Sequence, residues 1–219
     1  LGSGNLLATD LRLPSNPVHA AQALLTYKAR EIQPGLITCQ TPHGVKQRYF
    51  VVAAGVGSDA ELMYRTAVEA KERFGRNAYF IEMARMTFRG EFPMFHVDWK
   101  DEDGALHSEN VALVMAIRAR KFPGLLRFVN LRSSLLKPRY ALLIFRTDKV
   151  RHFLNYFASI ASGVNWKVPN VELVHANWFR CTATAEPRIR CQADGELLGS
   201  VPAEVGIAEK SFRLLMPPE

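Results

Sequence analysis

The sequence contains no hydrophobic run long enough to cross a membrane as a helix. A membrane-spanning helix needs about 20 mostly apolar residues, and the longest candidates, Phe50 to Gly57 and Tyr140 to Phe145, have the length of strands. The first residue is Leu1, and the segment behind it lacks the basic and then apolar order of a secretory signal. We therefore expect a protein that does not span a membrane, and a chain that begins inside a longer polypeptide.

Cysteine is scarce, with three residues in a chain of 219. Cys39, Cys181 and Cys191 are an odd-numbered set, and their spacing fits neither a secreted disulfide scaffold nor a zinc motif. The six histidines are scattered, without the paired spacing that zinc ligands show. These patterns predict a cytoplasmic protein with no metal site made by its own His and Cys residues.

Acidic residues are absent from 110 to 147, although the chain as a whole has a formal net charge of +7. The same stretch holds eight cations: Arg118, Arg120, Lys121, Arg127, Arg132, Lys137, Arg139 and Arg146. A charge run of this kind is most often a solvated basic face. The alternative is a surface that attracts anionic lipid headgroups. Binding to nucleic acid rests on net charge alone, because no recognition motif accompanies it, and we do not expect it.

The composition is that of an ordinary globular protein, with 48% hydrophobic and 22% charged residues. This length suits one domain, or one large domain with a small appendage. No internal repeat and no linker-like segment divides the chain.

Helices are predicted at four places. Asn16 followed by Pro17 is typical of a helix start, and apolar spacing carries this helix to near Lys28. Ser58 or Asp59 would cap a second helix. This second helix would continue through Glu61 to Phe74. Two further helices are predicted, over 77–89 and from Asp148 to Gly163.

Strand patterns dominate the rest of the chain. The segments 32–39 and 47–54 predict one hairpin, and 92–99 and 106–119 predict another around an Asp-Gly turn. Further strands are expected at 140–145 and 171–174, followed by short strands with frequent turns to the end. The expected fold class is mainly β with helices (α+β): a β-sandwich with a short helical arm in front.

Three motifs could carry chemistry. Residues 1–8, Leu-Gly-Ser-Gly-Asn-Leu-Leu-Ala, form a glycine-rich turn of the kind that approaches phosphates closely. Residues 54–60, Ala-Gly-Val-Gly-Ser-Asp-Ala, form a strand-to-helix turn, and 192–196, Gln-Ala-Asp-Gly-Glu, follow a strand. Each motif alone has a plainer interpretation, as a terminal turn, a capped helix start or a hairpin turn.

Taken together and in this order, the motifs resemble the second half of the diacylglycerol kinase catalytic family, which includes bacterial diacylglycerol kinases and the sphingosine and ceramide kinases. The first is similar to the family's Gly-Thr/Ser-Gly-Asn motif, the second to its Ala-Gly-x-Gly-x-Asp-Ala turn and the third to its late Asp-Gly-Glu motif. Residues 214–217, Leu-Leu-Met-Pro, resemble the closing strand. The resemblance covers nearly the whole chain.

The resemblance implies a two-lobed kinase whose nucleotide-binding lobe carries a Gly-Gly-Asp-Gly-Thr signature that this sequence lacks. Residues 1-30 would be the tail of that lobe and residues 31-219 the β-sandwich C-terminal lobe of a diacylglycerol/NAD kinase-like fold. The complete enzyme would use ATP and Mg²⁺ to phosphorylate a lipid hydroxyl, and these 219 residues alone would be inactive.

The resemblance also implies roles for single residues. Glu196 would be the catalytic base, with Asp194 orienting it. Gly2, Ser3, Gly4 and Asn5 would lie beside the nucleotide phosphates, and Gly55, Gly57 and Asp59 would support the cleft wall. One departure concerns Leu136-Lys137-Pro138, which stands where family members often carry acidic residues that serve a structural magnesium site. A lysine there removes oxygen ligands that Mg²⁺ requires, so we expect no metal at this loop.

A second hypothesis is a non-catalytic module that binds a lipid or an anionic membrane surface. The basic stretch favours it, whereas the retained Asp194 and Glu196 favour the kinase. Expected partners are a lipid substrate, the missing N-terminal lobe, an anionic membrane at which the protein would be peripheral, and a second copy of the chain paired through an exposed sheet edge.

Overall fold

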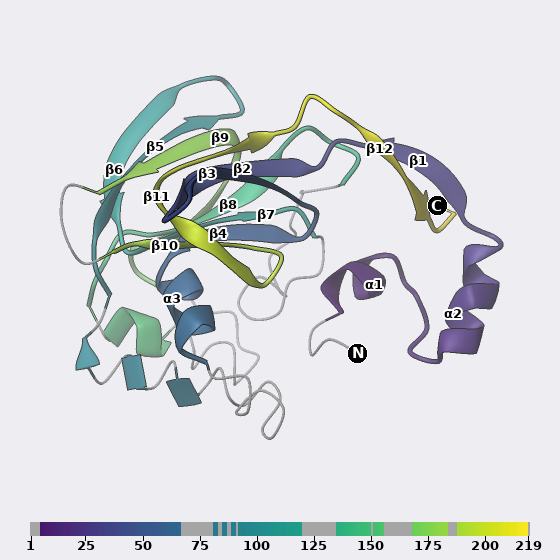
Figure 1. Ribbon diagram of the computed structural model, residues 1–219, viewed down its shortest axis with the longest axis horizontal. Helices are drawn as coiled ribbons and strands as arrows, with labels where there is room; N and C mark the ends of the chain where they lie inside the picture. The colour runs from purple at the N-terminus through teal and green to yellow at the C-terminus, as the bar shows by residue number, and fades with distance from the viewer. Residues whose placement is uncertain are drawn as a thin grey trace.

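The computed structural model describes residues 5–66, 81–82, 85–86, 89–90, 92–119, 135–149, 151–155, 168–183 and 188–218. Within these ranges the chain forms a β-rich body with short helices and an N-terminal helical arm (Figure 1). The helices are α1 (Leu6–Asp10), α2 (Pro17–Leu24) and α3 (Ser58–Arg65). The strands are β1 (Lys28–Ile32), β2 (Gly35–Thr41), β3 (Gly44–Phe50), β4 (Ala53–Gly57), β5 (Phe95–Asp101), β6 (Leu106–Val111), β7 (Leu113–Ile117), β8 (Tyr140–Phe145), β9 (Val171–Thr182), β10 (Arg190–Ala193), β11 (Glu196–Ile207) and β12 (Phe212–Met216).

Ten strands form one antiparallel sheet in the order β3-β2-β11-β10-β4-β7-β8-β9-β5-β6. The long strands β9 and β11 also pair with each other, through Ala203–Gly206 and Trp178–Cys181. This extra pairing folds the sheet into two layers, one made of β3, β2, β11, β9, β5 and β6 and the other of β10, β4, β7 and β8 (Figure 1). The expected mainly-β sandwich is confirmed.

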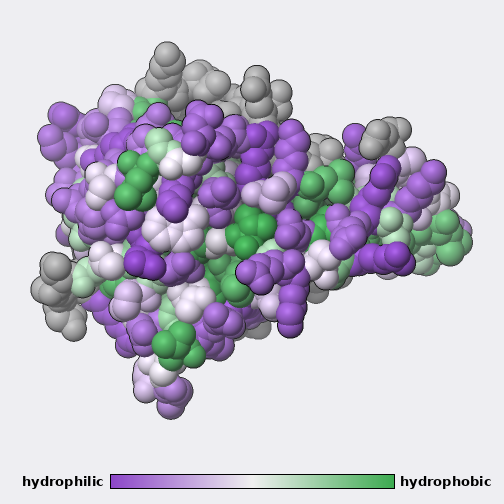
Figure 2. Space-filling view, turned by 90° about the horizontal axis from the view of Figure 1, so that it is seen from above, coloured by the Kyte–Doolittle hydropathy of each residue, from purple (hydrophilic) through white to green (hydrophobic). Residues whose placement is uncertain are grey.

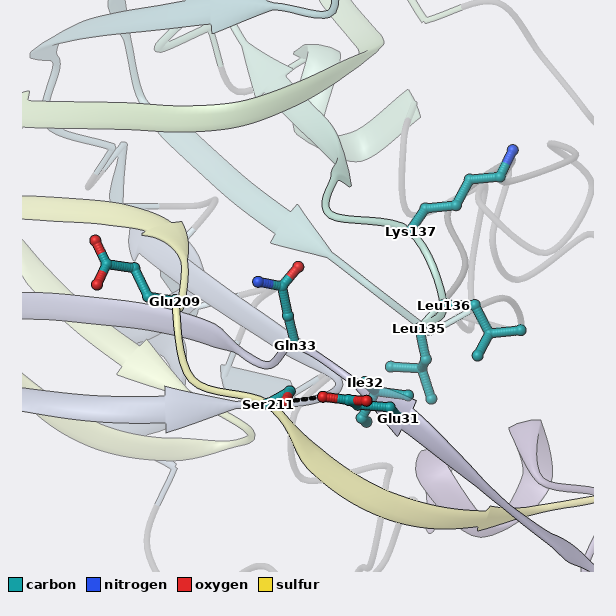
Figure 3. Close-up of a pocket in the computed structure, with 8 residues that line it drawn as sticks. All are labelled: Glu31, Ile32, Gln33, Leu135, Leu136, Lys137, Glu209 and Ser211. Atoms are coloured by element: carbon teal, nitrogen blue, oxygen red, sulfur yellow. Dashed lines mark hydrogen bonds between the residues drawn. The ribbon is translucent and has the colours of Figure 1, made fainter.

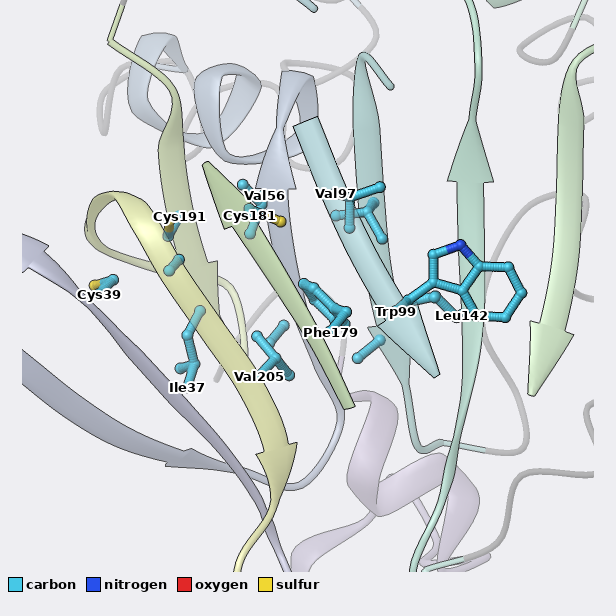
Figure 4. Packing of buried hydrophobic residues seen from close by; sticks show 14 of the residues in the cluster. Ile37, Cys39, Val56, Val97, Trp99, Leu142, Phe179, Cys181, Cys191 and Val205 are labelled. Carbon is cyan, nitrogen blue, oxygen red and sulfur yellow. The ribbon is translucent and has the colours of Figure 1, made fainter. Parts of the chain in front are cut away.

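The main core fills the space between the two layers. It is made of inward-facing side chains from both, such as Ile37 and Val205 from one layer and Val56 and Leu142 from the other (Figure 4). Phe179 packs edge-on against Tyr140, with ring centroids 6.0 Å apart. Alternate residues of β2 and β5 face this core, which is why these strands show period-two patterns in the sequence.

Strands β4, β7 and β8 are buried along their whole length. Their second face is covered by α3 and by the helical residues 151–155, and a second core forms there. Phe153 stacks on Phe92 with ring centroids 3.7 Å apart. Coverage on both faces explains why these three segments are continuous apolar runs rather than alternating patterns.

The helical arm and a separate two-stranded ribbon stand beside the body. Strand β1 pairs with β12, with Lys28 opposite Met216. A third small core, which includes Leu11, Ile32, Leu135 and Met216, joins the arm, this ribbon and the 135–137 segment. The proposed division at residue 30 falls inside β1 and stays a prediction.

The outer face of the β3-β2-β11-β9-β5-β6 layer is mostly hydrophilic, with separate hydrophobic patches (Figure 2). Registered pairs place six polar side chains in one row across the six strands: Ser108, Asp98, Arg180, Glu204, Thr38 and Gln47. Neighbours in the row bind one another, as in the 2.9 Å ion pair of Arg180 with Glu204. In the described part of the chain, no helix is long and apolar enough to cross a membrane.

Several predicted boundaries were wrong. The first helix ends at Leu24 instead of near Lys28, because Lys28 already belongs to β1. Helix α3 begins at Ser58 with Gly57 as its N-cap residue, so neither Ser58 nor Asp59 caps it. Helix α3 ends at Arg65 and Thr66 is extended, so the predicted single helix through Phe74 is wrong at this point, and residues 67–74 lie outside the described residues. The N-cap role of Asn16 is confirmed, since its side chain accepts hydrogen bonds from two backbone amides.

Two predicted long strands are each two strands. The segment 47–54 divides between β3 and β4 at Val51 and Val52, and 106–119 divides between β6 and β7 at Ala112. In the second case the N–H of Ala112 donates to Phe145 while its carbonyl accepts from Ser58. These contacts anchor Ala112 where the chain passes from one layer to the other, which hydrophobic patterning alone does not reveal.

Candidate functional site

Glu196 follows a tight turn between β10 and β11. Asp194 and Gly195 form this turn with backbone φ angles of 50° and 87°. Positive φ at both central residues is what two-residue hairpins require, and Asp-Gly is among the pairs that adopt it readily. The turn therefore projects Glu196 at the start of β11, where its side chain is exposed.

The carboxylate of Asp194 is used for structure. It accepts hydrogen bonds from the backbone N–H groups of Val51 (2.9 Å), Val52 (2.8 Å) and Ala53 (3.0 Å). These are the residues at which the chain leaves β3 and enters β4. Asp194 thus fixes the bend that divides the predicted 47–54 strand and attaches the turn to it.

A second set of contacts holds the turn from the other side. The side-chain amide of Gln192 donates to Asp59 Oδ2 at 2.8 Å, and its carbonyl oxygen accepts from the N–H of Gly195 at 3.0 Å. Asp59 lies in the first turn of α3, and Gln192 is buried on β10. The pair connects α3 to the backbone that carries Glu196.

Gly55 makes room for this pair. A methyl group on Gly55 would lie 2.7 Å from Asp59 Oδ2 and 3.0 Å from Gln192 Nε2. At Gly57, φ is 97° and a side chain would meet the carbonyl oxygen of Ala112 at 2.5 Å. Both glycines of the strand-to-helix motif are thus required by close approach, and Gly57 also by its backbone conformation.

Asp59 has an altered acidity. Burial of its carboxyl group raises the pKa from 3.8 to about 6, and the hydrogen bond from Gln192 offsets part of this rise. The protein therefore contains a carboxyl group with a pKa of about 6, joined through Gln192 to the turn before Glu196.

Glu196 itself makes an ion pair with Arg48, with 2.6 Å between Oε2 and Nη2. Arg48 comes from β3, which forms one edge of the sheet. Nothing in the sequence pointed to Arg48, because the contact joins residues far apart in the chain. Gln192 carried a weak signal, as a polar residue between Cys191 and Ala193 in a short strand.

The predicted nucleotide-binding segment is only partly described. Gly2, Ser3 and Gly4 lie outside the described residues. Asn5 is the N-cap residue of α1 with φ 41°, and its side chain makes no capping hydrogen bond. The roles assigned to these four residues, and those of Asp194 and Glu196, stay predictions.

The basic stretch is not one solvated face. Arg118 is fully buried, and its guanidinium donates to the carbonyl oxygens of Leu135, Lys137 and Arg139. Burial lowers the pKa of Arg118 to about 10. Arg139 pairs with Glu102, while Arg146 pairs with Glu109 and Glu172. The four cations at 120, 121, 127 and 132 lie outside the described residues. Among the described cations of this stretch, Lys137 is the exposed one.

A cavity of about 360 Å³ lies elsewhere, between the β1–β12 ribbon and the 135–137 segment (Figure 3). Glu31, Gln33 and Glu209 line it together with Lys137, and Glu31 accepts a hydrogen bond from Ser211. None of the predicted site residues lines this cavity. The described residues contain no group of three His, Cys, Asp or Glu side chains arranged to hold a metal ion.

No family model matches the sequence, and no curated protein matches it significantly. Solved structures do match. A diacylglycerol kinase from Bacillus anthracis str. Sterne aligns with a TM-score of 0.63 at 15% identity, over 99% of this chain and 67% of that one. Two structures from the same organism, each described as a candidate diacylglycerol kinase, align at 15% identity with TM-scores of 0.66 and 0.65. They too match 99% of this chain, and 66% and 67% of their own.

The chain has a diacylglycerol kinase-like fold. This likeness confirms the expected fold. At 15% identity it is evidence of fold alone. The chain spans 66–67% of the length of these diacylglycerol kinases. The residues around Glu196 therefore carry the evidence on activity.

Proposed function

We propose that this chain is the C-terminal lobe of an ATP-dependent kinase that phosphorylates a lipid hydroxyl of the diacylglycerol type. The observation that supports this most is the position of Glu196: an exposed carboxylate at the start of a strand, on a turn fixed by Asp194 and Gln192. A general base needs this combination of access and fixed backbone.

In the proposed reaction, the lipid hydroxyl oxygen forms a bond to the γ-phosphorus of ATP. The bond from that phosphorus to the oxygen bridging the β-phosphate breaks, and ADP leaves with the electron pair. The proton of the hydroxyl passes to the Glu196 carboxylate. The protein supplies position and electrostatics, as in phosphoryl transfer generally.

This lobe would act together with a nucleotide-binding lobe, ATP and Mg²⁺. A nucleotide-binding lobe would supply most contacts to ATP, with Gly2, Ser3, Gly4 and Asn5 at its border. Mg²⁺ would be held mainly by the nucleotide phosphates and by that lobe. The 219-residue chain alone should not turn over substrate.

The alternative, a non-catalytic module for anionic membranes, has lost part of its support. Three of the eight cations that favoured it are buried or paired with glutamates. A peripheral membrane location remains part of the kinase proposal, because its substrate would be a lipid.

The test compares Glu196→Gln with Glu204→Gln in the full-length protein, using transfer of labelled phosphate from ATP to diacylglycerol in mixed micelles. Glu204 is a matched control, since it lies on the same strand and is also paired with an arginine. We expect turnover to fall by about 100-fold or more in Glu196→Gln and to persist in Glu204→Gln. Equal turnover in both variants would remove Glu196 as the base.

A further inference from the structure

The ion pair between Glu196 and Arg48 restricts the carboxylate to which the catalytic role is assigned. Their side chains are 68% and 34% exposed, and among the described residues each has the other as its single polar side-chain partner. A carboxylate whose oxygen faces a guanidinium at 2.6 Å is occupied by a cation. The contact holds Oε2 against β3, so Glu196 can present only Oε1 to a hydroxyl while the contact persists.

The pair can open easily. Exposed ion pairs contribute little to stability, because water solvates both charges when they separate. The backbone around Glu196 is fixed independently by Asp194 and Gln192, so opening the pair requires side-chain motion alone. A ligand that binds Arg48 in place of the carboxylate would therefore free both oxygens of Glu196.

Arg48 is well placed to bind a phosphate. Arg48 on β3 is paired in register with Ile37 on β2. Lys46, two residues before Arg48 on the same strand, is paired with Cys39. Arg48 and Lys46 therefore project from the same side of the edge strand. A guanidinium offers a planar fork of donors that matches phosphate oxygens in pairs, and a phosphate dianion competes well against one exposed carboxylate.

We propose that Arg48 is a phosphate-binding residue that exchanges Glu196 for a phosphoryl group. In the free protein Arg48 holds Glu196. When the terminal phosphate of a nucleotide, or the phosphate monoester of a phosphorylated lipid, reaches Arg48, the carboxylate is released to face the acceptor hydroxyl. This inference rests on the proposed function, and it makes release of the base depend on the presence of the phosphoryl group.

The exchange predicts that one variant binds phosphate more tightly although it loses turnover. Because Glu196 competes with phosphate for Arg48, Glu196→Gln should bind phosphate more tightly than the wild type while losing turnover. Arg48→Met should bind it more weakly, and the double variant should behave like Arg48→Met. Lys46→Met is the matched control, since it removes a cation from the same side of the same strand.

The experiment measures binding by calorimetry at 150 mM salt to the full-length protein. Tripolyphosphate stands in for the nucleotide, and glycerol 3-phosphate for the phosphorylated lipid. We expect Arg48→Met to weaken binding of at least one probe by about tenfold, and Glu196→Gln to tighten the same probe by about threefold, the scale of one exposed ion pair. The probe that responds identifies which phosphate Arg48 binds.

Equal weakening in Arg48→Met and Lys46→Met would show attraction to charge alone and would overturn the proposal. So would a Glu196→Gln variant that binds both probes no more tightly than the wild type. Turnover separates this inference from the proposed function. If the wild type is active and Glu196→Gln is not, but Arg48→Met keeps the wild-type KM and kcat, the kinase stands and the exchange is wrong. If the wild type is inactive, the kinase proposal fails, and the binding series still decides whether Arg48 binds phosphate.

Discussion

Asp194 and Ala53 bind each other in both directions. The backbone N–H of Asp194 donates to the carbonyl oxygen of Ala53 at 2.8 Å, and the N–H of Ala53 donates back to Asp194 Oδ1 at 3.0 Å. This reciprocal pair attaches the turn before Glu196 to the first residue of β4. The aspartate of the Asp-Gly-Glu motif thus has a structural role that does not depend on catalysis.

Replacing Asp194 should therefore destabilise the fold. Asp194→Gly keeps the positive φ of the turn and removes the acceptors of three backbone amides, so we expect a loss of about 2–4 kcal/mol in the free energy of unfolding. Asp194→Asn should lose less, because Oδ1 alone accepts from Val52 and Ala53. Urea unfolding followed by circular dichroism measures both. A loss of no more than about 0.5 kcal/mol for the glycine variant would contradict this structural role of the Asp194 carboxylate.

Gly55→Ala should disturb the contact between Asp59 and Gln192. The added methyl group would come within 2.7 Å of Asp59 Oδ2 in a buried strand, and overpacking of this kind costs about 1–3 kcal/mol. Gly206→Ala is the control, because its nearest neighbour would be 3.9 Å away on the outer face. Thermal unfolding should show a lower midpoint for Gly55→Ala only, and similar midpoints for the two variants would argue against the close approach.

The raised pKa of Asp59 predicts a pH dependence of stability. Between pH 3.8 and about 6, the unfolded chain has released this proton while the folded chain retains it. The free energy of unfolding therefore falls as pH rises through this window. The full effect of the shift is about 3 kcal/mol at most. Below the window the carboxyl group is neutral in both states, and the penalty is absent.

Asp59→Asn cannot titrate and should escape this loss. The stability of Asp59→Asn relative to the wild type should increase from pH 4 to pH 6.5 and then level off. Urea unfolding of both proteins across this range measures the difference directly. A difference that does not change with pH would mean that Asp59 has an ordinary acidity in the folded chain.

Arg118→Met should destabilise the segment 135–139. The buried guanidinium donates to three backbone carbonyl oxygens there, and burying unpaired carbonyls costs about 1–3 kcal/mol each before relaxation. Lys137→Met removes an exposed charge from the same segment and serves as the control. Hydrogen exchange should show faster exchange in 135–139 for Arg118→Met alone. Equal protection in both variants would count against this role.

The sequence predicted the elements better than their boundaries. Hairpins around Asp-Gly and the start at Asn16-Pro17 are specified by local backbone preferences, so they were readable. The breaks at Val51 and Ala112 were not, because each depends on partners distant in the chain, Asp194 in one case and Ser58 with Phe145 in the other. Hydrophobic patterning continues through both breaks.

In the candidate site too, local motifs could be predicted and contacts between distant residues could not. Asp194, Gly195 and Glu196 were found as a motif, whereas Arg48 and the link from Asp59 through Gln192 needed the fold. The basic stretch misled for a related reason. A run of cations indicates charge but not exposure, and Arg118 is buried while Arg139 and Arg146 meet glutamates from other strands.

The proposed kinase activity is tested most directly by phosphoryl transfer with the full-length protein that contains these residues. The protein is incubated with γ-labelled ATP, Mg²⁺ and vesicles carrying diacylglycerol, and the lipid fraction is then analysed for label. We expect labelled phosphatidate from the wild type and none from Glu196→Gln. Wild-type protein that is folded and binds ATP, yet labels neither diacylglycerol nor other lipids with a free hydroxyl, would contradict it.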